Sequence, residues 1–184
     1  MADNRALALA SMTRAAGVHP FLIRVINRAI ATDPCFVLGE GVRSDADQLR
    51  DWQRGVSRLN GIPVGVVKNG IAGTGRGNHQ TNLADGLGHA SDLPPLINGL
   101  VWGGADSSDA DKWQGCYRTA SVMREAAIAE SVRLRWGGQW DVPLNDLPAG
   151  AVALEAAHNA YMANFHATHG RYPLADGPHF ELML

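Results

Sequence analysis

Apolar residues recur at the three- to four-residue spacing of a helix in several stretches of the chain. This spacing predicts helices over residues 7–15, 20–33, 45–61, 109–133 and 148–169. The second helix is the best marked, because Pro20 suits a first helical position and an apolar stripe follows it as far as Ile30. His19, directly before this proline, is interpreted as a helix-start residue.

Shorter apolar or alternating runs between the helices predict strands. They cover residues 35–42, 62–67, 88–93, 134–136 and 178–184. Asn69-Gly70 is a turn signal, and the six glycines between residues 70 and 88 indicate a loop. Because the strands are few and no βαβ rhythm appears, we predict an α+β fold with a small antiparallel sheet packed by several helices. No linker divides the chain, so residues 1–184 are expected to form a single domain.

Charge and composition narrow the classes of function. The net charge is -2, which gives no electrostatic footprint for nucleic acid. No run approaches the roughly 20 apolar residues that span a bilayer, so no membrane association is expected. The apolar run at the N-terminus is too short for a signal peptide, which predicts synthesis in the cytoplasm and action outside it only after release. Cys35 and Cys116 are interpreted as buried thiols, and pairing between them stays open.

Two segments carry histidine and carboxylate side chains that suit a zinc ion. His79 and Asp92 lie in and just after the glycine-rich stretch, and His179 lies near the C-terminus. A catalytic zinc commonly takes three protein ligands of these types and leaves one position for water. On spacing alone, a hydrogen-bonded loop is the competing interpretation.

The alternation of side chains along a strand helps to choose among the candidates. His89 and Asp92 fall on opposite faces of their strand, so they are poor joint ligands. His179 and Glu181 share a face, whereas Phe180 between them is predicted to face the core. Glu181 is then either a hydrogen-bond partner for a ligating imidazole or a surface strand residue, and both interpretations stay open.

Five short blocks of sequence reach from near the N-terminus to the last residues. They are Ala16-Gly-Val-His-Pro, Glu40-Gly-Val-Arg-Ser, Gly88-His-Ala-Ser-Asp-Leu, Arg135-Trp-Gly-Gly-Gln-Trp and Asp176-Gly-Pro-His-Phe-Glu-Leu. In this order they resemble the zinc L-alanyl-D-glutamate endopeptidases of phage lysis systems. These enzymes are relatives of the D-alanyl-D-alanine carboxypeptidases and share the fold of the hedgehog signalling domain.

The resemblance implies a zinc ion held by a histidine, an aspartate and a distant second histidine. Asp92 and His179 match the second and third ligands, and Asp176 matches the catalytic carboxylate that acts as general base. The first ligand departs from the family pattern, because Asp85 stands seven residues before Asp92 where the family has histidine. We predict His79 as the first ligand, with Asp85 as the alternative.

An arginine and two tryptophans are further candidates for the expected cleft. Arg43 matches an arginine that resembles the family's substrate or transition-state stabiliser, a role that suits a guanidinium facing an oxyanion. The alternative is a structural ion pair with Glu40 or with an aspartate on the following helix. Trp136 and Trp140 either line the cleft or pack in the core or at the rim.

The resemblance therefore implies an endolysin, a zinc-dependent hydrolase that cuts the L-Ala-D-Glu bond of the peptidoglycan stem peptide during phage-induced lysis. We expect a monomer with a single catalytic domain and no separate cell-wall-binding domain. Two alternatives stay open: a D-alanyl-D-alanine carboxypeptidase, and a zinc-stabilised binding module without turnover. Asp176 argues against the binding module, which has no need of a carboxylate beside the metal.

Overall fold

The computed structural model describes residues 13–184, so most of the helix predicted over residues 7–15 lies outside the described residues. The helices are α2 (Pro20–Thr32), α3 (Asp45–Gln53), α4 (Asp109–Ala129) and α5 (Ala151–His169), with a 3₁₀ turn at Leu144–Asp146. The strands are β1 (Val67–Lys68), β2 (Ile71–Ala72), β3 (Ala90–Asp92), β4 (Leu96–Ile97), β5 (Leu100–Val101), β6 (Leu134–Trp136) and β7 (His179–Leu182).

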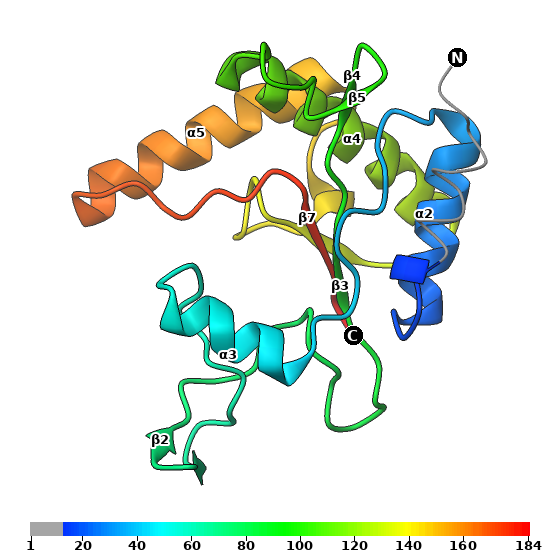
Figure 1. Ribbon diagram of the computed structural model, residues 1–184. Coiled ribbons are helices and arrows are strands. Elements are labelled where there is room, and N and C mark those ends of the chain that lie inside the picture. Colours follow the sequence, from blue (N-terminus) through cyan, green and yellow to red (C-terminus); the bar gives the residue numbers. More distant parts are fainter. Residues whose placement is uncertain (1–12) are drawn as a thin grey trace.

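A three-stranded antiparallel sheet in the order β3-β7-β6 stands at the centre of the molecule (Figure 1). In its register Asp92 of β3 lies directly opposite His179 of β7, and Trp136 of β6 lies opposite Phe180. Two separate hairpins, β1–β2 and β4–β5, contain the remaining strands. The C-terminal strand is therefore central, and it brings distant parts of the chain side by side.

The hydrophobic core lies between this sheet and the helices. Helices α2 and α4 pack against each other and against the sheet, and α5 packs against α4. Phe180 and Trp136 of the sheet and Leu22 and Met123 of the helices have no exposed surface. Burying such side chains supplies the main driving force for folding. Figure 1 shows α3 and the β1–β2 hairpin at the end of the molecule away from α4 and α5.

The predicted α+β class and the small antiparallel sheet are confirmed. All four helices predicted beyond residue 19 are present, but α3 ends at Gln53 instead of near residue 61. The backbone leaves the helix at Gly55, where φ is 73°, and Val56 beyond it is 73% exposed. The apolar residue Val56, which has no buried face to pack against, therefore does not extend α3 as predicted. Among residues 13–184, no helix combines the length and the apolar character needed to cross a membrane.

Residues 35–42, predicted as a strand, are extended but form only isolated bridges, at Phe36 with Pro95 and at Glu40 with Asp92. Pro94 and Pro95 lack a backbone N–H, so a regular ladder cannot form beside them. This part of the strand prediction was wrong in its pairing, although the segment is buried for much of its length.

Two asparagine–glycine pairs make tight turns. Asn69 and Gly70 have φ values of 52° and 78° and close the β1–β2 hairpin at the predicted turn. The predicted strand before it was wrong for residues 62–66, which form a bend and a turn, and strand pairing begins only at Val67. Asn98 and Gly99, with φ values of 52° and 77°, close the β4–β5 hairpin, which sequence reasoning missed despite the same signal.

Replacing Phe180 by alanine tests whether the centre of the sheet anchors the core. Phe180 is fully buried on the central strand, so Phe180→Ala should lower the free energy of unfolding by about 3–5 kcal/mol, measured by urea denaturation. Val152→Ala, at a side chain that is 81% exposed on α5, is the matched control and should change it by less than about 0.5 kcal/mol. Equal effects of the two substitutions would contradict this assignment of the core.

Candidate active site

His79, Asp92 and His179 come together where the glycine-rich loop meets strands β3 and β7. His79 Nε2 lies 3.0 Å from His179 Nδ1 and 3.1 Å from Asp92 Oδ1. The third distance, from His179 Nδ1 to Asp92 Oδ1, is 3.3 Å. Tetrahedral zinc with bonds of about 2.0–2.1 Å holds its ligand atoms roughly 3.3–3.4 Å apart. The triangle of ligand atoms is therefore close to the size that a zinc ion requires.

Hydrogen bonds on the far side of each imidazole decide which nitrogens face this triangle. His79 Nδ1 lies 3.0 Å from the Gly41 carbonyl oxygen, and His179 Nε2 lies 3.2 Å from Glu181 Oε2. Both oxygens can only accept, so these two nitrogens donate, and the other nitrogen of each ring faces the triangle. Asp92 Oδ1 is buried and receives no hydrogen bond of normal geometry. Two imidazole nitrogens and a carboxylate oxygen thus converge on one point, an arrangement that a cation resolves.

Glu181 supports His179 from the same face of β7. Its Oε2 also accepts a hydrogen bond from Asn78 Nδ2 at 2.5 Å, and its Oε1 accepts one from Arg135 Nη1 at 2.8 Å. Glu181 is only 5% exposed, while Phe180 beside it points into the core as predicted. Of the two interpretations of Glu181, the hydrogen-bond partner is therefore correct. A carboxylate in this position orients an imidazole toward a metal and raises its basicity.

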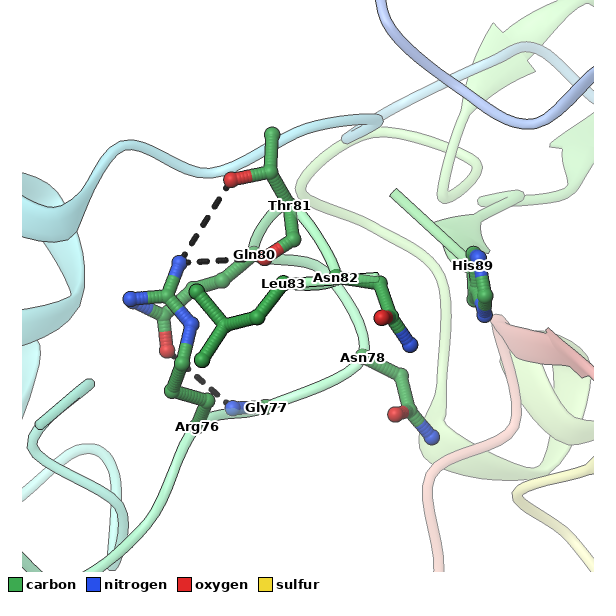
Figure 2. A pocket seen from close by; sticks show the side chains of 8 residues that line it. All are labelled: Arg76, Gly77, Asn78, Gln80, Thr81, Asn82, Leu83 and His89. Carbon is green, nitrogen blue, oxygen red and sulfur yellow. Dashed lines mark hydrogen bonds between the residues drawn. The ribbon is translucent and has the colours of Figure 1, made fainter. Parts of the chain in front are cut away.

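The loop before β3 is held in shape by its own hydrogen bonds (Figure 2). Arg76 Nη2 donates to the Thr81 carbonyl oxygen at 3.1 Å, and Gly77 N donates to Gln80 Oε1 at 3.1 Å. The His79 carbonyl oxygen in turn accepts from the backbone N–H of residue 43 at 2.8 Å. None of the three clustered side chains lines the cavity of about 260 Å³ enclosed by this loop. The loop therefore acts as a scaffold that holds His79 in place.

The electrostatics of the cluster favour a positive charge at its centre. Burial by itself disfavours a charged imidazole, but Asp92 and Glu181 outweigh it and raise the pKa of His179 to about 9. Burial by itself would raise the pKa of Asp92, but the facing imidazoles of His179 and His79 hold it well below its usual range. In the absence of another cation, a proton occupies the place that a metal ion would take.

Asp176 lies next to this cluster in the turn that leads into β7. Its backbone N–H donates to the Gly137 carbonyl oxygen at 2.9 Å, and its own carbonyl oxygen accepts from His179 N at 3.1 Å. A β-carbon on Gly137 would lie 2.2 Å from the Asp176 carbonyl oxygen and 3.0 Å from the β-carbons of Asp176 and His179. Burial raises the pKa of the Asp176 carboxyl, and the negative charge of Asp92 adds to this. A carboxyl with a raised pKa near a metal position suits proton transfer.

Arg43 lies near the cluster but its guanidinium is already engaged. Nε and Nη2 donate to the two carboxylate oxygens of Glu40, at 2.6 and 2.5 Å, and Nη1 donates to Gln48 Oε1 at 3.0 Å. Asp51 Oδ2 of α3 lies 3.7 Å from Nη1. The structure thus shows the ion pair that was the alternative interpretation, and a role in stabilising an oxyanion remains a prediction.

The remaining histidine and aspartate candidates form hydrogen bonds with residues close to them in the chain. Asp85, the alternative first ligand, lies 2.7 Å from His89 Nε2, and its other oxygen accepts a backbone N–H. His19 Nδ1 accepts a hydrogen bond from Phe21 N at 3.1 Å, as expected of a helix-start residue. His19, Asp85 and His89 form a second group of possible ligands, in which Asp85 pairs with His89 and the ring of His19 contacts that of His89. As the strand alternation predicted, His89 does not join Asp92.

The two tryptophans of the sequence blocks have different positions. Trp136 is fully buried, so the core interpretation is correct for it. Trp140 borders the candidate site, with its ring centroid 5.3 Å from that of His179. Cys35 and Cys116 are both buried free thiols.

Sequence reasoning did not identify Gly137, Asn78 or the Gly41 carbonyl as parts of the site. The Gly-Gly pair after Trp136 was an available signal for a close backbone approach. Nothing in the sequence marks Asn78, because its contact with Glu181 joins positions 103 residues apart.

Comparisons with known proteins agree with this geometry. The model of the phage L-alanyl-D-glutamate peptidase family matches residues 5–148, a range that contains His79 and Asp92 and ends before Asp176 and His179. The crystal structure of Serratia marcescens L-Ala D-Glu endopeptidase ChiX is similar over 94% of this chain and 86% of that chain, with 26% identity and a TM-score of 0.57. Among curated proteins, no significant match is found. The chain belongs to the phage L-alanyl-D-glutamate peptidase family.

Proposed function

We propose that this chain is a zinc-dependent peptidase that cuts the L-Ala-D-Glu bond of the peptidoglycan stem peptide in the bacterial cell wall. One observation carries the proposal: the ligand atoms of His79, Asp92 and His179 converge at distances of 3.0, 3.1 and 3.3 Å, close to the spacing that a zinc ion requires. Membership in the phage L-alanyl-D-glutamate peptidase family and similarity to an L-Ala D-Glu endopeptidase support the choice of bond.

His79 Nε2, Asp92 Oδ1 and His179 Nδ1 would hold the metal, and two histidines with one carboxylate are a known ligand set of catalytic zinc. Zinc bound there would polarise the scissile carbonyl and lower the pKa of the attacking water. The same donor types also suit ferrous iron, so the metal must be identified by measurement.

Asp176 is proposed as the general base. Its carboxylate accepts a proton from the attacking water and passes that proton to the amine nitrogen as the C–N bond breaks. The raised pKa of Asp176 helps the first transfer, because it makes the carboxylate a stronger base toward the attacking water. The turn that carries Asp176 packs on Gly137, so its position relative to His179 is set by backbone contacts.

Arg43 is proposed to add positive potential to the cleft and to steady the developing oxyanion. Its hydrogen bonds to Glu40 and Gln48 hold the guanidinium in one place, and they leave one N–H of each terminal nitrogen for substrate. Trp140 beside His179 is proposed as a wall of the cleft.

The alternatives are less well supported. A binding module has no need of Asp176, and the family match favours an endopeptidase over a D-alanyl-D-alanine carboxypeptidase. The described residues share one hydrophobic core, which supports the proposal that they act as a single catalytic domain. Capture of the stem peptide would then depend on the catalytic cleft, and the monomeric state remains part of the proposal.

Metal content by elemental analysis tests the ligand set. Wild-type protein should contain about one zinc per chain, and His79→Ala should lose it because one of three ligands is removed. Asp85→Ala and His89→Ala are matched controls in the same loop and should retain it, since both residues pair with each other instead. Loss of metal in Asp85→Ala alone would show that the ligand assignment is wrong.

Substitution of the proposed base separates catalysis from metal binding. Asp176→Asn should keep the zinc but lower cleavage of a stem peptide by roughly 10²–10⁴-fold, the usual contribution of a positioned general base. Asp146→Asn, at a surface carboxylate paired with Arg133, should leave both unchanged. Full activity in Asp176→Asn would rule out the proposed mechanism.

The support of His179 by Glu181 gives a prediction for metal affinity. Glu181→Gln removes the negative charge behind the imidazole, so zinc should bind roughly 10–100-fold more weakly in titrations against a competing chelator. Glu155→Gln on α5, where the carboxylate accepts only from Gln114 among the hydrogen bonds seen, is the control. Equal affinity in Glu181→Gln and wild type would show that this contact does not tune the metal.

A further inference from the structure

A pocket of about 330 Å³ adjoins Asp176 on the side away from the His79 loop. It is formed by the first turns of α4, the end of the β4–β5 hairpin and the turn before β7, elements that lie together in Figure 1. Trp102, Lys112, Trp113 and Cys116 line it together with Asp176. Of these residues, only Asp176 takes part in the proposed reaction.

The walls of the pocket are fixed by close packing. Trp113 stacks on His158 with ring centroids 4.5 Å apart, and a β-carbon on Gly177 would lie 3.1 Å from the Trp113 ring and 2.6 Å from Cys116 Sγ. Burial raises the pKa of the Cys116 thiol to about 12, so this wall is uncharged at neutral pH. The pocket is therefore a preformed, largely apolar space, and its charged lining residues are Asp109, Lys112 and Asp176.

Trp102 enters this space from a backbone conformation that is rare for a bulky residue. Its φ is 59°, and its N–H donates to the Pro95 carbonyl oxygen at 2.9 Å. Such a left-handed residue persists only where its surroundings hold it. This conformation places the Trp102 side chain in the pocket lining together with Trp113.

Lys112 is the only cation among the lining residues of the pocket. It stands in the first turn of α4, where the helix dipole disfavours a positive charge, so helix stability does not explain it. Its partner is Asp109, at 3.3 Å, whose side chain is 95% exposed. An exposed pair of this kind contributes little to stability, so Lys112 can exchange Asp109 for another carboxylate at little cost.

The proposed reaction decides which part of the substrate meets this pocket. Asp176 returns its proton to the amine nitrogen of D-glutamate, so the D-glutamate residue must lie on the Asp176 side of the cleft. A glutamate residue linked onward through one carboxyl group keeps the other free and negatively charged. Resting on the proposed function, we propose that this pocket binds the D-glutamate residue and that Lys112 recognises its free carboxylate.

Two synthetic stem peptides that differ only in this group test the proposal, one with the free carboxylate of D-glutamate and one with the corresponding carboxamide. Wild-type protein should cleave the carboxylate peptide with a kcat/KM roughly ten- to a hundredfold higher, the usual weight of a hydrogen bond to a charged group. Lys112→Gln should lose this preference by slowing only the carboxylate peptide, and Lys112→Arg should keep much of it.

Lys68→Gln is the matched control, because Lys68 is the only other lysine of the chain and is exposed on β1. It should leave the preference unchanged, and equal urea midpoints should show that all variants are folded. A preference that survives in Lys112→Gln, or an equal loss on both peptides, would overturn the assignment of Lys112 while leaving the proposed function intact. If wild-type protein loaded with zinc cleaves neither peptide, the proposed function fails and the subsite with it.

Discussion

The rest of the site depends on one constraint: two imidazole nitrogens and a carboxylate oxygen converge on one buried point, which a cation must occupy. The Gly41 carbonyl and the Glu181 carboxylate impose this by accepting hydrogen bonds from the outer nitrogens of His79 and His179. Repulsion between acceptors in a poorly solvated place is costly unless a cation sits among them. The hydrogen bonds to the Gly41 carbonyl and to Glu181 therefore orient the two histidines toward a metal position.

The fold meets this constraint with very little regular structure. Cross-strand pairing of β3 with β7 places Asp92 opposite His179, and alternation along β7 sends Phe180 into the core between two functional side chains. The core that holds Phe180 thus also fixes the direction of His179 and Glu181. His79 comes from a loop without strand pairing at its position, which is held by hydrogen bonds of its own side chains and backbone. Rigid strands and a cross-braced loop together supply the precision that such a site needs.

The two sides of the cleft differ in chemistry. On the side of the His79 loop, Arg43 is held by Glu40 and Gln48 and contributes a fixed positive charge. On the side of Asp176, α4 contributes Trp113 and Lys112 to a mostly apolar pocket. In the function that we propose, this asymmetry would orient a substrate with unlike residues on either side of the scissile bond.

Local patterns in the sequence were enough to predict the helices α2, α4 and α5 and the strands that flank the site. They also predicted that His89 and Asp92 point in opposite directions. Helix spacing and strand alternation depend only on neighbouring residues, so both can be read from the sequence. The order of five sequence blocks was enough to indicate the family. Tertiary structure alone brought His79, the predicted first ligand, beside Asp92 and His179, left Asp85 paired with His89, and gave Glu181 its role. These outcomes depend on contacts between residues far apart in the chain and on which group satisfies which hydrogen bond, and no local pattern encodes either.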